Sequence, residues 1–215
     1  MKEEYFTEKN LRRKSVKIFK EVEKILRINN IKFSPENSAL LVLDMQNFFL
    51  DRKSHAFIPS APAIIPVVKK LIKKYYEKNL TVIFTRHINN LKNAGNMKKW
   101  WKDLIRGNSR YSKIHEAIDI SKSIIIKKFQ YDAFYKTKLE KILKRNRVKQ
   151  VVITGVMTHL CCETTARSAF MRGFDVFFVI DGTATYNYKF HLSTILNLSH
   201  GFAVPALSEN LIKNL

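Results

Sequence analysis

Cysteine is scarce in this sequence: the 215 residues include only two, the adjacent Cys161 and Cys162. Two neighbouring cysteines cannot build a disulfide framework, and a bond between them would close a strained ring. No apolar run approaches the roughly eighteen residues that span a bilayer, and the opening MKEEYFTEKNLRRK has no apolar core of an export signal. We therefore expect reduced thiols, no membrane partner and a cytoplasmic location.

Linkers, internal repeats and low-complexity stretches are also missing. A chain of 215 residues that is 46% hydrophobic can bury one substantial core but is short for two. We predict an N-terminal helical extension, residues 1–34, and one globular domain, residues 35–215. The extension has an apolar stripe that favours packing on the domain or on a neighbouring subunit over a membrane, formed by Leu11, Ile18, Phe19, Val22, Ile25 and Leu26.

Acidic residues are outnumbered, with 18 Asp and Glu against 39 Lys and Arg, which gives a formal net charge of +21. Such a charge attracts phosphate backbones. The basic residues are scattered through every segment, however, and the sequence contains neither an RNP box nor paired zinc ligands. We expect a solvated basic surface and keep nucleic-acid binding as the alternative from a different functional class.

Five short apolar runs predict strands, at residues 39–44, 80–85, 123–128, 150–155 and 175–181. The runs are continuous rather than alternating, which is typical of strands buried on both faces. Segments whose apolar residues have helical spacing lie between the predicted strands, for example residues 61–78. Another such segment begins at Thr137 and Glu140, which form a capping-box pattern. With a sixth strand near residues 201–204, the pattern predicts a three-layer α/β/α fold around a mostly parallel six-stranded sheet.

Three reactive side chains stand at the carboxyl ends of these runs, where open parallel sheets bind ligands: Asp44, Lys128 and Cys161. Each alone has a structural alternative, as a turn aspartate, a surface lysine or a small core residue. Together they supply the base, cation and nucleophile that thiol-based acyl transfer requires. The sequence therefore indicates an active site at this edge of the sheet.

A helix predicted to begin near Thr158 distinguishes the two cysteines. Cys162 falls on a stripe of small residues suited to packing on the sheet, with Ala166, Ala169 and Gly173. Cys161 lies in the first turn, where free N–H groups favour a thiolate, on a more polar side with Thr164, Thr165 and Ser168. We predict Cys161 as the nucleophile and Cys162 as a packing residue.

Three ordered motifs carry a resemblance to a known family: LLVLDMQNFFL, KKFQYDAFYKTKLEKIL and VVITGVMTHLCCETTARSAF. In order and separation they resemble the isochorismatase-like cysteine hydrolases, which include nicotinamidases, N-carbamoylsarcosine amidases and isochorismatases. The resemblance covers residues 38–207. It implies a dimer or tetramer, in whose contact the N-terminal helix could take part, that acts on a small-molecule amide without a cofactor.

The motif positions imply a role for each matching residue. The resemblance places a catalytic base at Asp44, a lysine that stabilises its charge and lowers the thiol pKa at Lys128, and the nucleophile at Cys161. It also implies a cis peptide bond between Val156 and Met157, which directs the Met157 N–H, beside that of Cys161, into an oxyanion hole. Non-proline cis bonds are kept at functional sites.

The thiol at position 161 separates two reactions of the family. Members that hydrolyse isochorismate, a vinyl ether, typically carry glycine there, so the resemblance with Cys161 retained implies a hydrolase that cleaves an amide or carbamoyl C–N bond through a thioester. Isochorismatase-type ether hydrolysis is the alternative.

The sequence departs from the nicotinamidases at their metal motif. That motif has an aspartate followed two residues later by histidine, and here His87 and Asn89 stand at these positions. We therefore predict no metal site, which makes nicotinamide a less favoured substrate. Candidate substrate-binding residues, each with the alternative of a core or subunit contact, are Phe48, His87, Trp101, Tyr131, Phe134 and His159.

Overall fold

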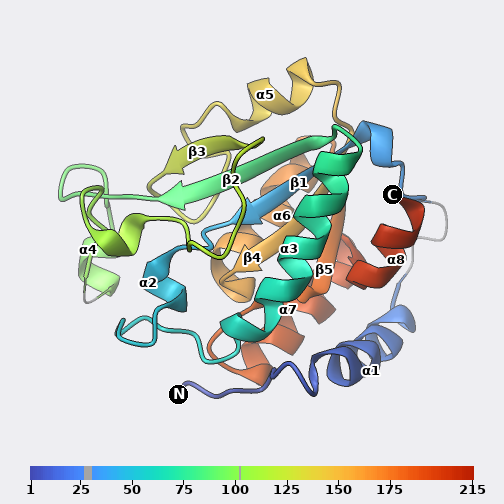
Figure 1. Ribbon diagram of the computed structural model, residues 1–215, viewed down its shortest axis with the longest axis horizontal. Helices are drawn as coiled ribbons and strands as arrows, with labels where there is room; N and C mark the ends of the chain where they lie inside the picture. Colours follow the sequence, from blue (N-terminus) through green and yellow to red (C-terminus); the bar gives the residue numbers. More distant parts are fainter. Residues whose placement is uncertain (27–30, 102) are drawn as a thin grey trace.

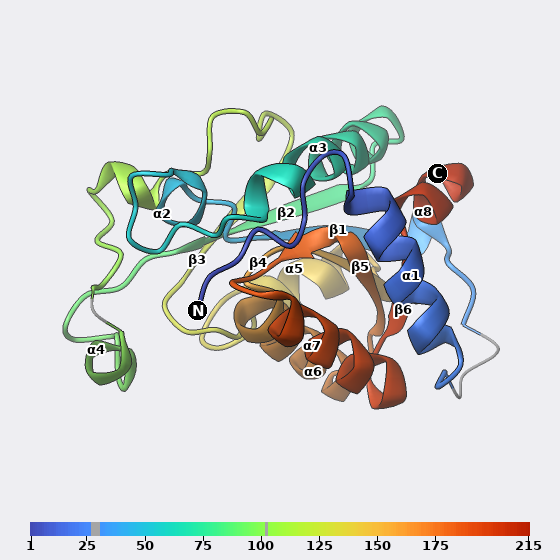
Figure 2. The same cartoon turned by 90° about the horizontal axis from the view of Figure 1, so that it is seen from below.

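The computed structural model describes residues 1–26, 31–101 and 103–215. Six parallel strands form one sheet in the order β3-β2-β1-β4-β5-β6 (Figure 1). Helix α3 covers one face and helices α6 and α7 cover the other (Figure 2). The predicted three-layer α/β/α fold is confirmed. The strands are β1 (Ser38–Leu43), β2 (Thr81–His87), β3 (Ile124–Lys128), β4 (Gln150–Val156), β5 (Asp175–Ala184) and β6 (Val204–Ala206).

The central strands are buried as their continuous apolar runs predict, since every residue of β1 and β4 is buried. The edge strand β3 differs, because Ile124 and Ile125 are 38% and 44% exposed. The prediction that this run is buried on both faces is wrong, since β3 has a neighbouring strand on one side only. The last strand begins at Val204, three residues later than predicted, because helix α7 continues to Gly201.

The long helices lie where the sequence pattern places them. They are α3 (Ala61–Glu77), α6 (Glu163–Met171) and α7 (Tyr188–Gly201), with shorter helices α2 (Asn47–Leu50), α4 (Met97–Trp100), α5 (Leu139–Arg145) and α8 (Ser208–Asn214). The capping box before α5 does not form. Thr137 Oγ1 accepts the Leu139 N–H at 3.1 Å, but Glu140 turns outward to pair with Lys144 and Arg172.

The N-terminal helix α1 (Leu11–Glu23) packs on the sheet and on α7, with Leu11, Ile18 and Val22 buried. Ile25, from the far end of the predicted stripe, is 36% exposed because α1 ends before it. A domain boundary at residue 34 stays a prediction. Within the described residues, no helix combines the length and apolarity that a membrane crossing requires.

Strands β1 and β4 lie close together at Gly155, which is paired with Leu43. Its φ is +111°, and a Cβ at this position would lie 2.1 Å from the Leu43 carbonyl oxygen. Both the backbone conformation and the close contact require glycine. This contact fixes the register of the two strands directly before Asp44 and the turn after β4.

Replacing Gly155 with alanine should therefore lower the free energy of unfolding by at least about 3 kcal/mol, through backbone strain and overpacking. Urea denaturation measures the change. Gly201→Ala is the matched control, because a Cβ there meets no atom within 4 Å. Equal stabilities of the two variants would contradict the account.

Candidate active site

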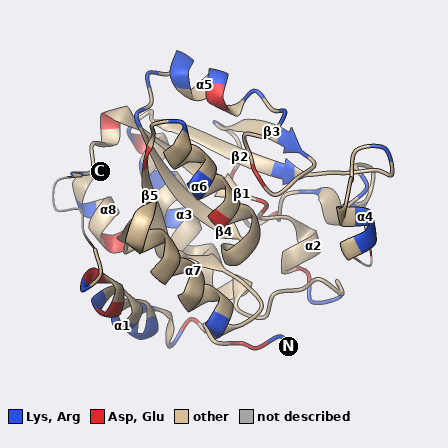
Figure 3. Cartoon of the chain, turned by 180° about the vertical axis from the view of Figure 1, so that it is seen from behind, with Lys and Arg blue, Asp and Glu red and all other residues tan. Residues whose placement is uncertain are grey.

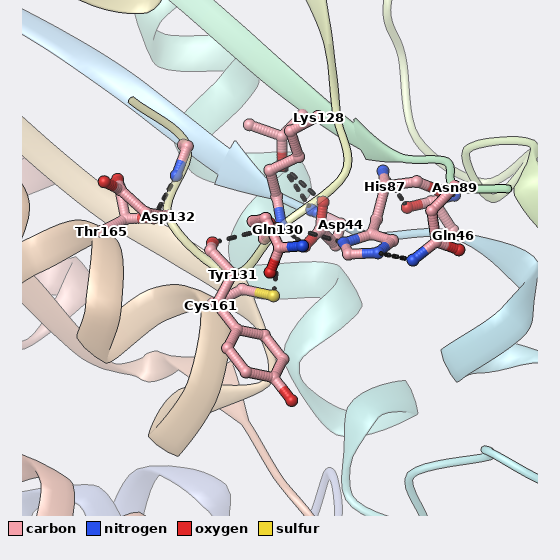
Figure 4. Close-up of polar contacts among 12 residues, drawn as sticks. Asp44, Gln46, His87, Asn89, Lys128, Gln130, Tyr131, Asp132, Cys161 and Thr165 are labelled. Atoms are coloured by element: carbon pink, nitrogen blue, oxygen red, sulfur yellow. Dashed lines mark hydrogen bonds and ion pairs between the residues drawn. The ribbon is translucent and has the colours of Figure 1, made fainter. Parts of the chain in front are cut away.

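The three predicted reactive residues meet at one edge of the sheet (Figure 4). Asp44 directly follows β1, Lys128 ends β3, and Cys161 lies in a turn after β4. Parallel strands place their carboxyl ends together, and the strand order sets β1 beside both β2 and β4. Lys128 reaches across the end of β2 to Asp44. The donor atoms of Asp44, His87 and Cys161 all lie within 4.8 Å of one another.

Asp44 is fully buried and is fixed by its neighbour strand. Its Oδ1 accepts the Thr85 hydroxyl at 2.6 Å, and its own N–H donates to Thr85 Oγ1 at 3.1 Å. The other oxygen, Oδ2, lies 2.7 Å from Lys128 Nζ. Asp44 therefore has a hydroxyl donor at one oxygen and the ammonium of the site at the other.

Lys128 is 1% exposed, and its ammonium connects the site. Besides the Asp44 carboxylate, Nζ donates to the Gln130 carbonyl oxygen at 2.9 Å, to the Tyr131 carbonyl oxygen at 3.3 Å and to Cys161 Sγ at 3.3 Å. Two neutral carbonyls and one carboxylate are the partners that a buried cation needs. The Lys128 ammonium thus contacts both the Asp44 carboxylate and the Cys161 thiol.

The charges of the pair are mutually stabilised. Burial alone would raise the pKa of Asp44, but the Lys128 ammonium and its other neighbours hold that pKa below its usual value. Burial acts in the opposite direction on Lys128, and Asp44 and Cys161 hold its pKa above the usual value. At neutral pH the site therefore contains an aspartate anion and an ammonium cation.

The Cys161 thiol is protonated in this arrangement. Burial is the largest cause that raises its pKa, to about 12, and the Asp44 carboxylate adds to it, while Lys128 opposes both. Lys128 lowers the thiol pKa as predicted, but burial outweighs this effect and the net shift is upward. The helix begins at Thr158 as predicted, with a π-helical turn, Thr158–Cys162, that leads into α6 at Glu163. Formation of a thiolate must therefore be coupled to proton transfer.

The turn after β4 separates the roles of the two cysteines. The Val156–Met157 peptide bond is cis. Cys161 faces Lys128, whereas Cys162 is fully buried beneath the turn, together with Ala166 and Ala169. Gly173, assigned to the same small-residue stripe, is exposed after the end of α6, so the stripe is shorter than predicted.

A cavity of about 210 Å³ opens onto Cys161. Its walls are largely aromatic, from Phe48, Trp101, Tyr131 and Tyr186, and the Trp101 indole N–H donates to the Tyr131 hydroxyl at 2.6 Å. His87 also lines the cavity. Among the described residues, no lysine or arginine lines it. The cavity has the size and character for a small uncharged molecule.

Two of the predicted substrate contacts, Phe134 and His159, do not line this cavity. Phe134 is buried against Phe174, with ring centroids 6.0 Å apart, because the segment after Tyr131 turns back onto the core. The His159 ring points away from the cavity, where its Nδ1 lies 2.6 Å from Thr185 Oγ1 and the ring stacks on Phe190.

Tyr186 and Asp103 also line the cavity and escaped the sequence analysis. Tyr186 lies two residues after β5, which extends to Ala184, beyond the predicted end of this strand at residue 181. Asp103 lies in an irregular segment, where its carboxylate is 3.4 Å from His55 Nδ1. Asn89 was considered only as a metal position, yet it also lines the cavity and its Oδ1 accepts the Ile105 N–H at 3.1 Å.

The residues at the family's metal positions do not fit a metal ion. His87 Nδ1 lies 3.3 Å from Lys128 Nζ, and its Nε2 lies 3.2 Å from Asn89 Nδ2. The Asn89 oxygen is taken by a backbone N–H. Asp44, His87 and Cys161 offer one donor atom each, but the Lys128 ammonium contacts all three. The donor atoms of this cluster are therefore already engaged with the Lys128 ammonium.

The fold and the site define a hydrolase of the three-layer α/β class with a cysteine at its centre. The chain belongs to the isochorismatase family, whose model, described as the isochorismatase domain, matches residues 38–210. "Nicotinamidase 3" from Arabidopsis thaliana is 38% identical over 183 residues, covering 83% of this chain and 88% of the relative.

Two solved structures are similar over most of their length. A cysteine hydrolase from Pseudomonas syringae pv. phaseolicola superposes with a TM-score of 0.82 at 22% identity, over 86% of this chain and 94% of that chain. A zinc-bound pyrazinamidase from Pyrococcus horikoshii superposes with a TM-score of 0.72 at 26% identity, over 80% of this chain and 99% of that chain. The first of these similarities shows the shared fold.

Stability should depend on His87 in acid. Burial, and then the Lys128 charge, lower its pKa to about 3 from 6.5, so it stays neutral in the folded chain while the unfolded chain binds a proton. The unfolded state thus binds more protons than the folded state between pH 6.5 and 3. The free energy of unfolding therefore decreases as the pH is lowered through this window, by about 1.4 kcal/mol per pH unit for one histidine.

Denaturant unfolding at several pH values tests this dependence. The variant His87→Asn should show a slope that is smaller than that of the wild type by about 1.4 kcal/mol per pH unit. His191 is buried with a similarly lowered pKa and contributes equally to both proteins. Parallel pH profiles would refute a neutral, buried His87.

Proposed function

We propose that the chain is a cysteine-dependent amidohydrolase that cleaves the C–N bond of a small, uncharged carboxamide through a thioester. One observation carries the proposal: a single ammonium, Lys128 Nζ, lies 2.7 Å from the Asp44 carboxylate and 3.3 Å from the Cys161 sulfur, which lines an apolar cavity. Base, cation and nucleophile thus converge where a substrate amide would enter.

The first step forms the thioester. Asp44 accepts the Cys161 proton while Sγ attacks the carbonyl carbon, and the carbonyl π electrons move onto the oxygen. The backbone N–H groups of Met157 and Cys161 would stabilise this oxyanion, each by roughly 3 to 4 kcal/mol. The C–N bond then breaks, the protonated Asp44 gives its proton to the nitrogen, and ammonia or an amine leaves.

The second step releases the acid. Asp44, again a carboxylate, accepts a proton from water, whose oxygen attacks the thioester carbon. The C–S bond breaks as the second oxyanion collapses, the sulfur regains a proton from Asp44, and a carboxylic acid leaves. Lys128 stays protonated throughout. Its charge balances whichever of Asp44 and Cys161 is the anion, which offsets the elevated pKa of the thiol.

Cavity chemistry supports an uncharged substrate. A buried carboxylate is costly unless it is paired, and the carboxylate of Asp103, which lines the cavity, would repel another. The relative named Nicotinamidase 3 makes nicotinamide the first compound to test. In the sequence analysis, the missing metal motif made nicotinamide a less favoured substrate than other amides. If the chain hydrolyses nicotinamide, we expect this activity to be independent of metal.

The basic surface does not favour the nucleic-acid alternative. Lysine and arginine lie on many separate elements rather than in one patch (Figure 3). A binding module would also have no use for a buried Asp44, Lys128 and Cys161. Two free thiols support a cytoplasmic location. The exposed Phe170 and Met171 on α6 support a homo-oligomer, a dimer or a tetramer.

Replacing Cys161 with alanine should abolish ammonia release from an amide substrate, because the thioester cannot form. The matched variant Cys162→Ala removes the neighbouring buried thiol, which makes no contact with Lys128. It should keep activity within about threefold while losing about 1 kcal/mol of stability. An active Cys161→Ala enzyme, or an inactive but folded Cys162→Ala enzyme, would contradict the assignment.

An ammonia-release assay in the presence of EDTA can test the substrate class. Nicotinamide should give a kcat/KM at least roughly tenfold above that of N-carbamoylglycine, because no lysine or arginine among the described lining residues could pair with the carboxylate. Loss of activity on adding EDTA would refute the metal-independent mechanism. Preference for the carboxylate-bearing compound would refute the assignment of an uncharged substrate.

A further inference from the structure

The first six residues run across the end of the sheet between α3 and α7 before α1 begins (Figure 2). Phe6 N–H donates to Ser60 Oγ at 3.0 Å, just before α3, and Glu3 N–H donates to the Tyr186 carbonyl oxygen at 2.8 Å, just before α7. This N-terminal segment, residues 1–6, lies outside the range that the family model matches.

Tyr5 is the deepest polar contact of the segment. Its side chain is buried, with the residue 3% exposed, and its hydroxyl accepts the Thr185 N–H at 2.9 Å. The ring packs against Phe6 and His191, with centroids 4.6 Å and 5.3 Å away. Tyr5 therefore contacts both the end of β5 and the start of α7.

These neighbours of Tyr5 hold the turn that carries the nucleophile. Thr185 Oγ1 lies 2.6 Å from His159 Nδ1, and His191 Nδ1 lies 3.1 Å from Thr158 Oγ1. Both His159 and Thr158 belong to the π-helical turn that ends at Cys162. Tyr5 thus supports the side of the turn that faces away from the substrate, through its contacts with Thr185 and His191.

We propose that Tyr5 is a positioning residue of the active site, supplied by a segment outside the family domain, which fixes the Thr158–Cys162 turn so that Cys161 Sγ stays beside Lys128 and Asp44. The predicted effect of Tyr5 on turnover rests on the proposed amidohydrolase function. Its predicted effect on the reactivity of the Cys161 thiol is independent of that function.

Helix α1 anchors the segment in place. The Thr7 N–H donates to Asn10 Oδ1 at 2.9 Å, and Lys14 Nζ donates to the Tyr5 carbonyl oxygen at 2.8 Å. The helix itself is held by its buried face on β5, β6 and α7. This gives the N-terminal helix a role: it keeps Tyr5 beneath the nucleophile turn.

The variant Tyr5→Phe tests the proposal, because it keeps the buried ring and removes only the hydroxyl. Tyr75→Phe is the matched control. Tyr75 is equally buried and its hydroxyl lies 2.8 Å from Ser38 Oγ, but Ser38 begins β1, at the opposite end of the sheet from the site. Both variants lose a buried hydroxyl, and thermal denaturation verifies that both are folded.

Two readouts are taken on the full chain. The first is the rate of alkylation of Cys161 by iodoacetamide, mapped by peptide mass spectrometry, and the second is kcat and KM for nicotinamide. Tyr5→Phe should lower the alkylation rate and kcat on the order of tenfold, because a small misplacement of a nucleophile is costly. KM should not change, since Tyr5 does not line the cavity.

Tyr75→Phe should match the wild type in both readouts. An alkylation rate for Tyr5→Phe equal to that of Tyr75→Phe would overturn the proposal, as would a change confined to KM. If the wild type does not hydrolyse nicotinamide, that substrate assignment fails, and the alkylation rate alone decides the role of Tyr5.

Discussion

The buried ion pair between Lys128 and Asp44 is the interaction on which the site depends. Both side chains are inaccessible to solvent, and their charged atoms lie 2.7 Å apart. Burying either charge alone would be prohibitively costly, so each requires the other and the carbonyl and hydroxyl groups around it. The sheet order, the Thr85 hydroxyl and the backbone turn after Lys128 all serve this requirement.

The ion pair also determines the chemistry. Because the charges of Asp44 and Lys128 offset each other, a second negative charge on Cys161 is unfavourable in the resting site, and the sulfur keeps its proton. Once Asp44 takes that proton, the same ammonium faces a thiolate at 3.3 Å. Nucleophile activation is then the exchange of one anion partner of Lys128 for another, with no change in net charge. In this account the exchange involves no metal, and both ring nitrogens of His87 are in contact with Lys128 or Asn89.

Sequence reasoning found the parts of the site that regular structure positions. Asp44 and Lys128 follow or end apolar strands, and parallel strands bring such positions together. It placed Phe134 and His159 wrongly, because turns and loops direct their side chains and periodicity carries no information about such segments. The raised thiol pKa and the contacts of Tyr5 depend on burial among residues far apart in the chain, which a linear pattern does not encode.

The central claim is that Cys161 becomes acylated during turnover, with Asp44 accepting the thiol proton and Lys128 balancing the negative charge. Acid quenching of the enzyme during hydrolysis of a carboxamide, followed by peptide mass spectrometry, observes this state directly. The account predicts an acyl group of the substrate's mass on Cys161, absent when the amide is omitted. An unmodified Cys161 under conditions of continuing turnover, or the acyl group on Cys162, would contradict it.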